Sequence, residues 1–406
     1  MPTAEGRTKI AENLTSKDLY NNPYPIYREL RDHEPWAWSN ELKVWLVTRY
    51  DDALFVDQHP EIFTAYQDNS LAERAMGQGT LVRTDGEAHR RLRMATDGPL
   101  KRRTVRERWA EGLQSHAREL VDQLIQKPEF DLVTDFAAPF AAQALVRVVG
   151  LLGVTTSQIV DWSGAFIAGL ANHENDPEVW QRCEQAYSEV GELVREKIAS
   201  VRAVPDHSLI SAMAHANLDD PLTDEEIATQ VRLIFSGGFN EPWDAIATLV
   251  WHLCDQPELR ERVLTDPAAL DAAFDETARW LTPTGAFPRQ LAVDYTVGDV
   301  TMRAGQKLLA VASSANRDER KFASPDTFDI DRPNLQDHMG FSLGAHYCLG
   351  VYLAREQMRT AIPMLFNSLD NLRLVRQPKL VGWMFCGLQS LEMRHDTTDV
   401  KNGFAK

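Results

Sequence analysis

The feature that most constrains the fold is one long helical segment near the middle of the chain. Thr223 and the three acidic residues after it form a capping box, and apolar residues then recur at helical spacing as far as Cys254, before Pro257 stops the pattern. At 1.5 Å per residue such a helix spans about 45 Å, roughly the width of a molecule of this size. The sequence therefore predicts a helix that crosses the core.

The interior of this segment contains poor helix formers. Gly237, Gly238 and Pro242 all weaken a helix, and Pro242 also lacks the N–H that would bond to the carbonyl of Gly238. We therefore expect a kink at this point and a Gly238 carbonyl that is free to accept another hydrogen bond.

The remaining pattern predicts a mainly α fold with a small β region. The 406 residues are 44% hydrophobic and 25% charged, which is typical of a globular protein, and no repeat or Gly/Ser linker divides residues 1–406, so we expect a single domain. Strand-like runs occur only at residues 44–48, 290–294 and 306–312. A loop-rich stretch at 313–344 precedes a helix at 351–369.

Charge and hydropathy exclude several classes of function. The net charge of −16 argues against binding to nucleic acid, which requires a basic surface. The polar N-terminal residues do not resemble a signal peptide, and the most apolar stretch, 139–154, is interrupted by Gln143 and Arg147 and is too short to span a membrane. We expect a cytoplasmic protein, with a monomer as the default.

The strongest local motif is the glycine-containing loop 341–350, which brings Cys348 to the start of the helix at 351–369. A helix N-terminus stabilises negative charge and so favours the thiolate, the form of cysteine that binds metals. Most lone cysteines, however, are small buried apolar residues. The loop alone leaves both interpretations open.

This loop resembles the haem-binding loop of the cytochrome P-450 superfamily, Phe-Gly-x-Gly-x-His-x-Cys-x-Gly, with Ser342 at a position where glycine is usual. Glu276 and Arg279 fit the Glu-x-x-Arg motif of the family, and Arg332 follows in its meander. The resemblance implies a P-450 fold with haem b between the long central helix and the cysteine-loop helix. Cys348 would be the axial ligand, and the other three residues would form an ion network that holds the loop.

The same resemblance implies a set of side chains around the haem. Residues 85–93 are similar to the His-x-x-x-Arg helix of the family, in which His89 and Arg93 would reach a propionate. Arg289 and His346 would complete the propionate contacts, and Phe341 would contact the cofactor. Considered alone, His89 would more often be a surface or packed histidine.

The sequence departs from the family pattern where an acid and a threonine usually relay protons to bound O2. Asn240 occupies the acid position and Glu241 the threonine position. A carboxyl group in an apolar pocket has a raised pKa and can act as a general acid or base, whereas an amide cannot ionise. Glu241 is therefore the candidate for proton delivery. The alternatives are a relay through water on the Gly238 carbonyl and, as a mechanistic variant, turnover driven by hydrogen peroxide.

Weaker similarities bear on the substrate. The Asn-Glu-Pro run and residues 382–391 resemble the bacterial aryl-ether O-demethylases, which act on guaiacol or syringol; by that resemblance Phe385 would contact the substrate and Leu170 would be a second lining residue. O-demethylation with release of formaldehyde is our first hypothesis. The second is hydroxylation of a terpene, fatty acid or natural-product intermediate, and the third is a non-enzymatic haem-thiolate sensor or carrier.

A segment rich in basic residues suggests where an electron-donating protein would bind. The segment from His89 to Arg108 contains eight Lys or Arg residues and two acids, a local charge of +6. Such runs are usually solvated surface. By resemblance, however, Arg90–Arg108 would border the cysteine side of the haem, where a separate ferredoxin or flavin/iron-sulfur reductase docks.

Overall fold

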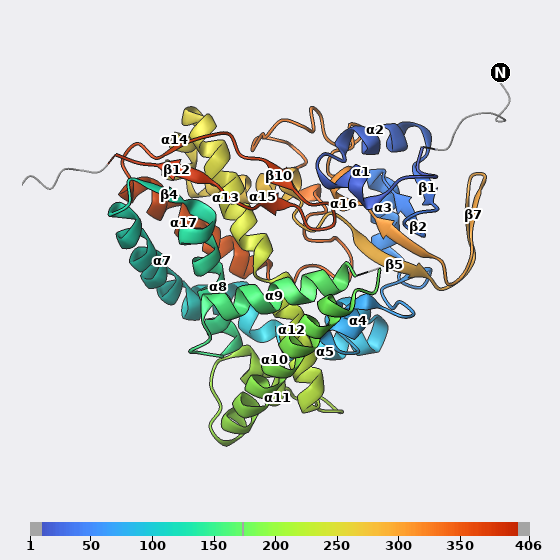
Figure 1. Ribbon diagram of the computed structural model, residues 1–406, viewed down its shortest axis with the longest axis horizontal. Helices are drawn as coiled ribbons and strands as arrows, with labels where there is room; N and C mark the ends of the chain where they lie inside the picture. The colour runs from blue at the N-terminus through green and yellow to red at the C-terminus, as the bar shows by residue number, and fades with distance from the viewer. Residues whose placement is uncertain (1–9, 173, 397–406) are drawn as a thin grey trace, which may run out of the picture.

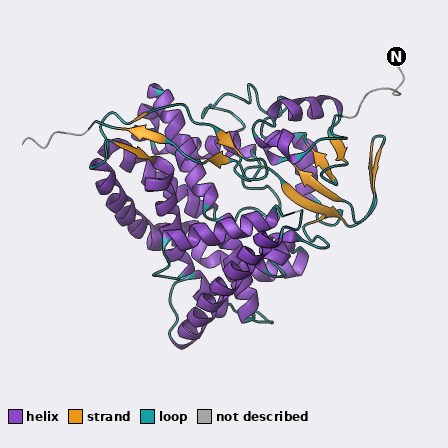
Figure 2. Cartoon of the chain, in the orientation of Figure 1, coloured by secondary structure: helices purple, strands orange, loops and turns teal. Residues whose placement is uncertain are grey.

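The computed structural model describes residues 10–172 and 174–396, and within them helices predominate (Figure 2). The mainly α prediction is confirmed. The α-helices are α1 Ser16–Tyr20, α2 Tyr24–His33, α3 Tyr50–Gln58, α4 Leu71–Met76, α5 Gly86–Leu100, α6 Arg102–Thr104, α7 Ala110–Ile125, α8 Ala138–Val149, α9 Thr156–Leu170, α10 Pro177–Ala203, α11 Leu209–Ala214, α12 Asp224–Gly237, α13 Asn240–Asp255, α14 Pro257–Thr265, α15 Pro267–Leu281, α16 Ala312–Ala315 and α17 Val351–Ser368.

Short 3₁₀ and π segments interrupt or extend some of these helices: η1 Leu81–Arg83, η2 Val105–Trp109, η3 Val133–Ala137 and η4 Leu335–Asp337. The strands are β1 Trp36–Ser39, β2 Val44–Val47, β3 Phe63–Thr64, β4 Glu129–Asp131, β5 Phe287–Leu291, β6 Tyr295–Val297, β7 Val300–Met302, β8 Lys307–Ala310, β9 Arg373–Leu374, β10 Leu380–Val381, β11 Gly387–Leu388 and β12 Glu392–Arg394. No helix in the described part of the chain is long and apolar enough to cross a membrane.

The predicted central helix is wrong in one respect: the segment forms two helices. Helix α12 ends at Gly237 and α13 begins at Asn240, with Gly238 and Phe239 between them. Pro242 therefore lies in the first turn of α13, where a backbone N–H has no partner within the helix, so the missing donor costs no helical hydrogen bond. The capping box is present as expected, because Glu226 N donates to Thr223 Oγ1 at 3.2 Å.

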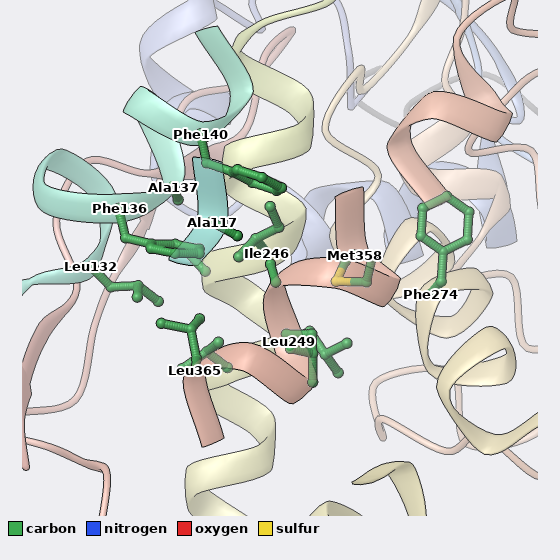
Figure 3. Close-up of a cluster of buried hydrophobic side chains, with 14 of the residues drawn as sticks. Ala117, Leu132, Phe136, Ala137, Phe140, Ile246, Leu249, Phe274, Met358 and Leu365 are labelled. Atoms are coloured by element: carbon green, nitrogen blue, oxygen red, sulfur yellow. The ribbon is translucent and has the colours of Figure 1, made fainter. Parts of the chain in front are cut away.

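The two halves of the segment belong to different parts of the core. The buried residues of α13, including Ile246 and Leu249, recur at helical spacing and pack with η3, α8, α15 and α17. Figure 3 shows Ile246 close to Phe140 and Leu249 close to Leu365. The buried residues of α12 instead join a second cluster with α9 and α10, which are labelled above and below α12 in Figure 1. Each half is thus fixed by its own packing.

The main sheet gathers on one side of the molecule, near α1, α2 and α3 (Figure 1). Its strand order is β1-β2-β8-β5-β3, with only the β2–β8 pair parallel. The predicted strands at 44–48 and 306–312 correspond to β2 and β8. The strand predicted at 290–294 is instead β5, which ends at Leu291 because Asp294 accepts a hydrogen bond from Ala304 N and turns the chain. Strand β5 carries Arg289 opposite Leu308 of β8.

Candidate active site

Cys348 lies two residues before Gly350, the N-cap residue of α17, in a loop that closes on itself. Its backbone N–H donates to Phe341 O at 2.9 Å. Burial raises the pKa of the thiol, against the opposing effect of the Gly350 and Val351 N–H groups. The N–H groups at the helix start therefore favour the thiolate, as expected from the sequence, but burial outweighs them. Ionisation of this cysteine has to be stabilised by a bound metal as well.

Phe341, at the start of the loop, packs on the helix that carries the Glu-x-x-Arg motif. Its ring stacks on Phe274 of α15 with the centroids 5.4 Å apart, and it joins the same apolar cluster as α13 and α17. This contact fixes the beginning of the cysteine loop against the core.

A buried carboxylate that the sequence analysis missed holds the middle of the loop. Asp57, in the last turn of α3, accepts hydrogen bonds from Ser342 Oγ at 2.7 Å and from Leu343 N and Gly344 N at 2.9 Å. Its other oxygen lies 3.0 Å from Arg289 Nη2. The one sequence signal was Ser342, which departs from the glycine usual at that position.

A second carboxylate holds the far end of the loop. His346 Nε2 lies 2.9 Å from Asp85 Oδ1, and Asp85 Oδ2 accepts from Thr64 Oγ1 and Ala65 N at 2.7 Å. Burial alone would raise the pKa of Asp85, but the hydrogen bonds from His346, Thr64 and Ala65 outweigh burial and lower it to about 2. In this structure His346 therefore bonds to a carboxylate of the protein itself.

His89 and Arg93 lie one turn apart on α5 and both approach the cysteine loop. The His89 ring is 4.4 Å from the His346 ring, and burial together with the neighbouring His346 and Arg93 lowers the pKa of His89 to about 4. At neutral pH His89 is uncharged. Arg93 donates to Tyr347 O at 3.0 Å and pairs with Asp97 at 3.0 Å.

The donor groups of this region fit haem. Arg83, which the sequence analysis also missed, has a buried Nε with no hydrogen-bond partner among the described residues, and burial and Arg289 lower its pKa to about 10. Arg83 as a whole is half-buried, but a guanidinium nitrogen taken out of water without a partner is costly unless an anion binds there. Carboxylates such as the haem propionates suit a group comprising Arg83, His89 and Arg289. Cys348 supplies the soft ligand for iron.

Glu276, Arg279 and Arg332 meet in one buried network, as the family resemblance implied. Arg279 makes two contacts of 2.7 Å with the Glu276 carboxylate, and Arg332 Nε lies 3.1 Å from Glu276 Oε1. The side chains are almost fully inaccessible. Both arginines also donate to backbone carbonyls of the chain between Asn316 and Thr327, so the network ties α15 to the loops that precede Cys348.

At the junction of α12 and α13 the structure places Gly238 ahead of Asn240 and Glu241. Glu241 Oε2 is buried and has no partner within the described residues, and burial raises the pKa of this carboxyl to about 7. One turn further on, Asp244 is engaged differently: it accepts from Leu388 N at 2.8 Å and from Trp243 Nε1 at 2.9 Å. Both of these bonds are accepted by Asp244 Oδ1, whereas Glu241 differs in having a fully buried oxygen, Oε2, without a partner among the described residues.

The two residues expected at the substrate lie on separate elements. Phe385 forms an isolated β-bridge with Thr284, and the backbone on either side of it bonds to Pro283 O and Gly285 N at 2.9 Å. Leu170 is the last residue of α9 and is partly buried against the second apolar cluster. The bridge holds the Phe385 segment beside the loop that follows α15.

Comparison with known proteins identifies the family. Residues 35–379 match the family model described as Cytochrome P450. The chain is 34% identical over 365 residues to mycinamicin IV hydroxylase/epoxidase of Micromonospora griseorubida, covering 86% of this chain and 88% of that protein. It is 28% identical to the biotin biosynthesis cytochrome P450 of Bacillus subtilis, covering 90% and 93%.

Solved structures agree with this result. P450BioI, determined in complex with an acyl carrier protein ligated to hexadec-9Z-enoic acid, superposes with a TM-score of 0.83 at 25% identity, over 92% of this chain and 99% of that one. CYP108D1 of Novosphingobium aromaticivorans has the same fold, with a TM-score of 0.84 over 95% and 99% of the two chains at 24% identity. The chain belongs to the cytochrome P450 family. It is a monooxygenase whose cofactor is haem with a cysteine thiolate ligand, for which Cys348 is the cysteine.

Removal of the charge on Glu276 tests the buried network. We expect Glu276→Gln to lower the free energy of unfolding by about 3–5 kcal/mol, because two buried arginines lose their counter-ion. Chemical denaturation of the haem-loaded protein, followed by circular dichroism, measures this change. The matched control is Arg262→Ala, which breaks the 2.7 Å pair with Asp331 whose side chains are 53% and 63% exposed; it should cost under about 1 kcal/mol. Equal losses in the two variants would contradict the assignment.

Proposed function

We propose that this cytochrome P450 hydroxylates an unactivated C–H bond of a largely hydrophobic natural-product-type substrate, and that Glu241 delivers the protons that the reaction consumes. The observation that carries the proposal is Glu241 Oε2, which is buried without a hydrogen-bond partner among the described residues, at the break between α12 and α13. A relative at 34% identity that is named as a hydroxylase/epoxidase supports this type of reaction. The non-enzymatic alternative is set aside, because the named relatives are enzymes.

Haem, when bound to Cys348, supplies the activation of O2 and the oxidation of the substrate C–H bond. The protein residues supply the protons. With a pKa of about 7, the Glu241 carboxyl is partly protonated at neutral pH, so it can both release and regain a proton there. Asn240 cannot ionise and can only donate or accept hydrogen bonds. Because Gly238 lies at the break between α12 and α13, its carbonyl can hold a water molecule on the same route.

O-demethylation of a methoxylated aromatic is the second candidate. It is favoured by the sequence Asn240-Glu241-Pro242 and by the Phe385 segment, in which the β-bridge to Thr284 would hold the ring beside a small flat substrate. In this reaction the methyl carbon is hydroxylated, and the resulting hemiacetal breaks down to formaldehyde and a phenol. Leu170 would be a second contact in either reaction. The named relatives favour hydroxylation over demethylation.

An optical titration of the purified ferric protein separates the two substrate classes. We expect a macrolide such as mycinamicin IV or a fatty acid to give a saturable low-spin to high-spin change at micromolar concentration, since a correctly placed ligand displaces water from the iron. Guaiacol and syringol are the comparison ligands. If only these two respond, and turnover releases formaldehyde, the demethylase candidate replaces hydroxylation.

The pH dependence of turnover tests Glu241. Because its pKa is raised to about 7, the carboxyl is protonated below that pH, and a proton-donating role requires the rate of product formation to fall as the pH rises through 7. We expect Glu241→Gln to lower this rate about 10²-fold and to remove the inflection. The spin-state titration should still give an unchanged affinity for substrate.

Two further acidic groups face Glu241, and one of them provides the control. Burial, with a smaller contribution from the charge of Glu241, raises the pKa of Asp244 and of the Cys348 thiol. Asp244→Asn keeps an oxygen acceptor for Leu388 N and should leave the inflection near pH 7 in place. If Glu241→Gln keeps the native rate, the water on the Gly238 carbonyl is the relay instead.

We also propose that a separate acidic ferredoxin docks on the basic segment. Four of its eight basic residues already have acidic partners: Arg90 with Glu87, Arg91 with Glu226, Arg93 with Asp97 and Arg103 with Glu107. The other four, Lys101, Arg102, Arg106 and Arg108, are exposed and make no ion pair with any described residue. These four supply the charge that would steer an acidic protein.

Reversal of two of these charges tests the docking face. We expect Arg102→Glu with Arg106→Glu to raise the KM for an acidic ferredoxin about tenfold, with a weaker dependence on ionic strength. Turnover driven by hydrogen peroxide, where the protein supports it, and the spin-state titration should not change. Arg182→Glu, on exposed α10, is the control. An equal effect of the control would mean that net charge, and not this face, governs the interaction.

A further inference from the structure

Asp57 stands where a carboxylate is electrostatically unfavourable. It lies in the last turn of α3, the negative end of the helix dipole, and its side chain is completely buried. A buried charge is tolerated only when hydrogen bonds and counter-charges replace the lost hydration. The position therefore requires compensation from other parts of the chain.

That compensation comes from the two elements that the haem site depends on. One carboxylate oxygen takes the Ser342 hydroxyl and the Leu343 and Gly344 N–H groups of the cysteine loop, and the other pairs with Arg289 of β5. The Asp57 side chain thus fixes the position of the cysteine loop relative to the buried Arg289.

The loop sequence is adapted to this carboxylate. Ser342 has φ +61°, a left-handed conformation that costs a non-glycine residue roughly 1–2 kcal/mol, and its hydroxyl donates to Asp57. At Gly344, by contrast, an ideal Cβ would lie 2.4 Å from the backbone oxygen of Asp57. Position 344 is glycine because the backbones of Gly344 and Asp57 are in contact there, and position 342 is serine, whose hydroxyl donates to Asp57.

We propose that Asp57 is a positioning residue that sets the cysteine loop and Arg289 for haem binding, and that Ser342 replaces the usual glycine in order to bond to it. Loss of Asp57 frees three loop donors and leaves Arg289 without its counter-ion. Ser342 immediately follows Phe341, whose carbonyl accepts from Cys348 N, so a shift at Ser342 moves the ligand. The proposal depends on haem binding and not on which substrate is oxidised.

The experiment measures the rate of haem transfer from the holoprotein to excess apomyoglobin, and the absorption of the ferrous CO complex, which reports thiolate ligation. We expect Asp57→Ala to accelerate haem loss about tenfold and to reduce the thiolate-ligated fraction. Asp57→Asn keeps the shape and one acceptor oxygen, so its effect should be intermediate. If the alanine variant fails to fold, the asparagine variant provides the test.

Asp318 provides the matched control at the other end of the same helix. It is buried, and its Oδ2 accepts from Tyr50 N, the first residue of α3, at 3.0 Å. Asp318→Asn should lower the unfolding temperature without changing haem loss or the CO spectrum. If Asp57→Asn matches Asp318→Asn in all three measurements, Asp57 only stabilises the helix and the proposal is overturned.

Substitution of Ser342 tests the pairing directly. In the native background Ser342→Gly relieves the backbone strain but removes one hydrogen bond, so haem loss should change less than about threefold. In the Asp57→Ala background the strain is no longer offset, and Ser342→Gly should slow haem loss towards the native rate. Additive effects of the two substitutions would overturn the proposed pairing.

Discussion

The placement of the cysteine ligand depends on one buried carboxylate, Glu276. The long connection between α16 and α17 contains no strand and only one short 3₁₀ turn in the described structure, so its backbone cannot be fixed by a sheet. Glu276 instead holds Arg279 and Arg332, which between them bind carbonyl oxygens along that connection, and Glu276 itself accepts from Asp329 N at 2.8 Å. Each charge is tolerated only because the others are present, which makes this irregular segment rigid.

The same principle recurs closer to the haem site. Two side chains that the family resemblance assigns to the propionates, Arg289 and His346, each contact a carboxylate of the protein, Asp57 and Asp85 respectively. The cysteine loop is therefore held at two points. Asp57 binds its middle, and Asp85 binds His346 near its far end. Arg83 differs, because its buried Nε has no partner among the described residues. The geometry of the site is set by the protein, and an uncompensated positive group remains for a bound anion.

The sequence could predict those features whose residues lie close together in the chain. The Glu276–Arg279 pair, the Thr223 capping box and the Cys348 loop lie within a few residues and follow from spacing. Asp57 could not be found in this way, because an acid near a helix end is usually solvated and its partners are distant in sequence. The sequence predicts a kink and not a break after Gly237, because apolar periodicity continues on both sides of it. Tertiary packing alone divides the segment between two clusters.

Because the segment is divided, Gly238 and Phe239 at the junction do not have to adopt a helical conformation. In a continuous helix, positions 238–241 would be constrained by helix propensity and by the i to i−4 hydrogen bonds. Here α12 and α13 are each anchored by separate apolar contacts, and of the junction residues Phe239 is fully buried in the second cluster. Glu241, which we propose as the proton donor, therefore lies in the first turn of α13 and not in the interior of a continuous helix, so this acid is accommodated without a new fold.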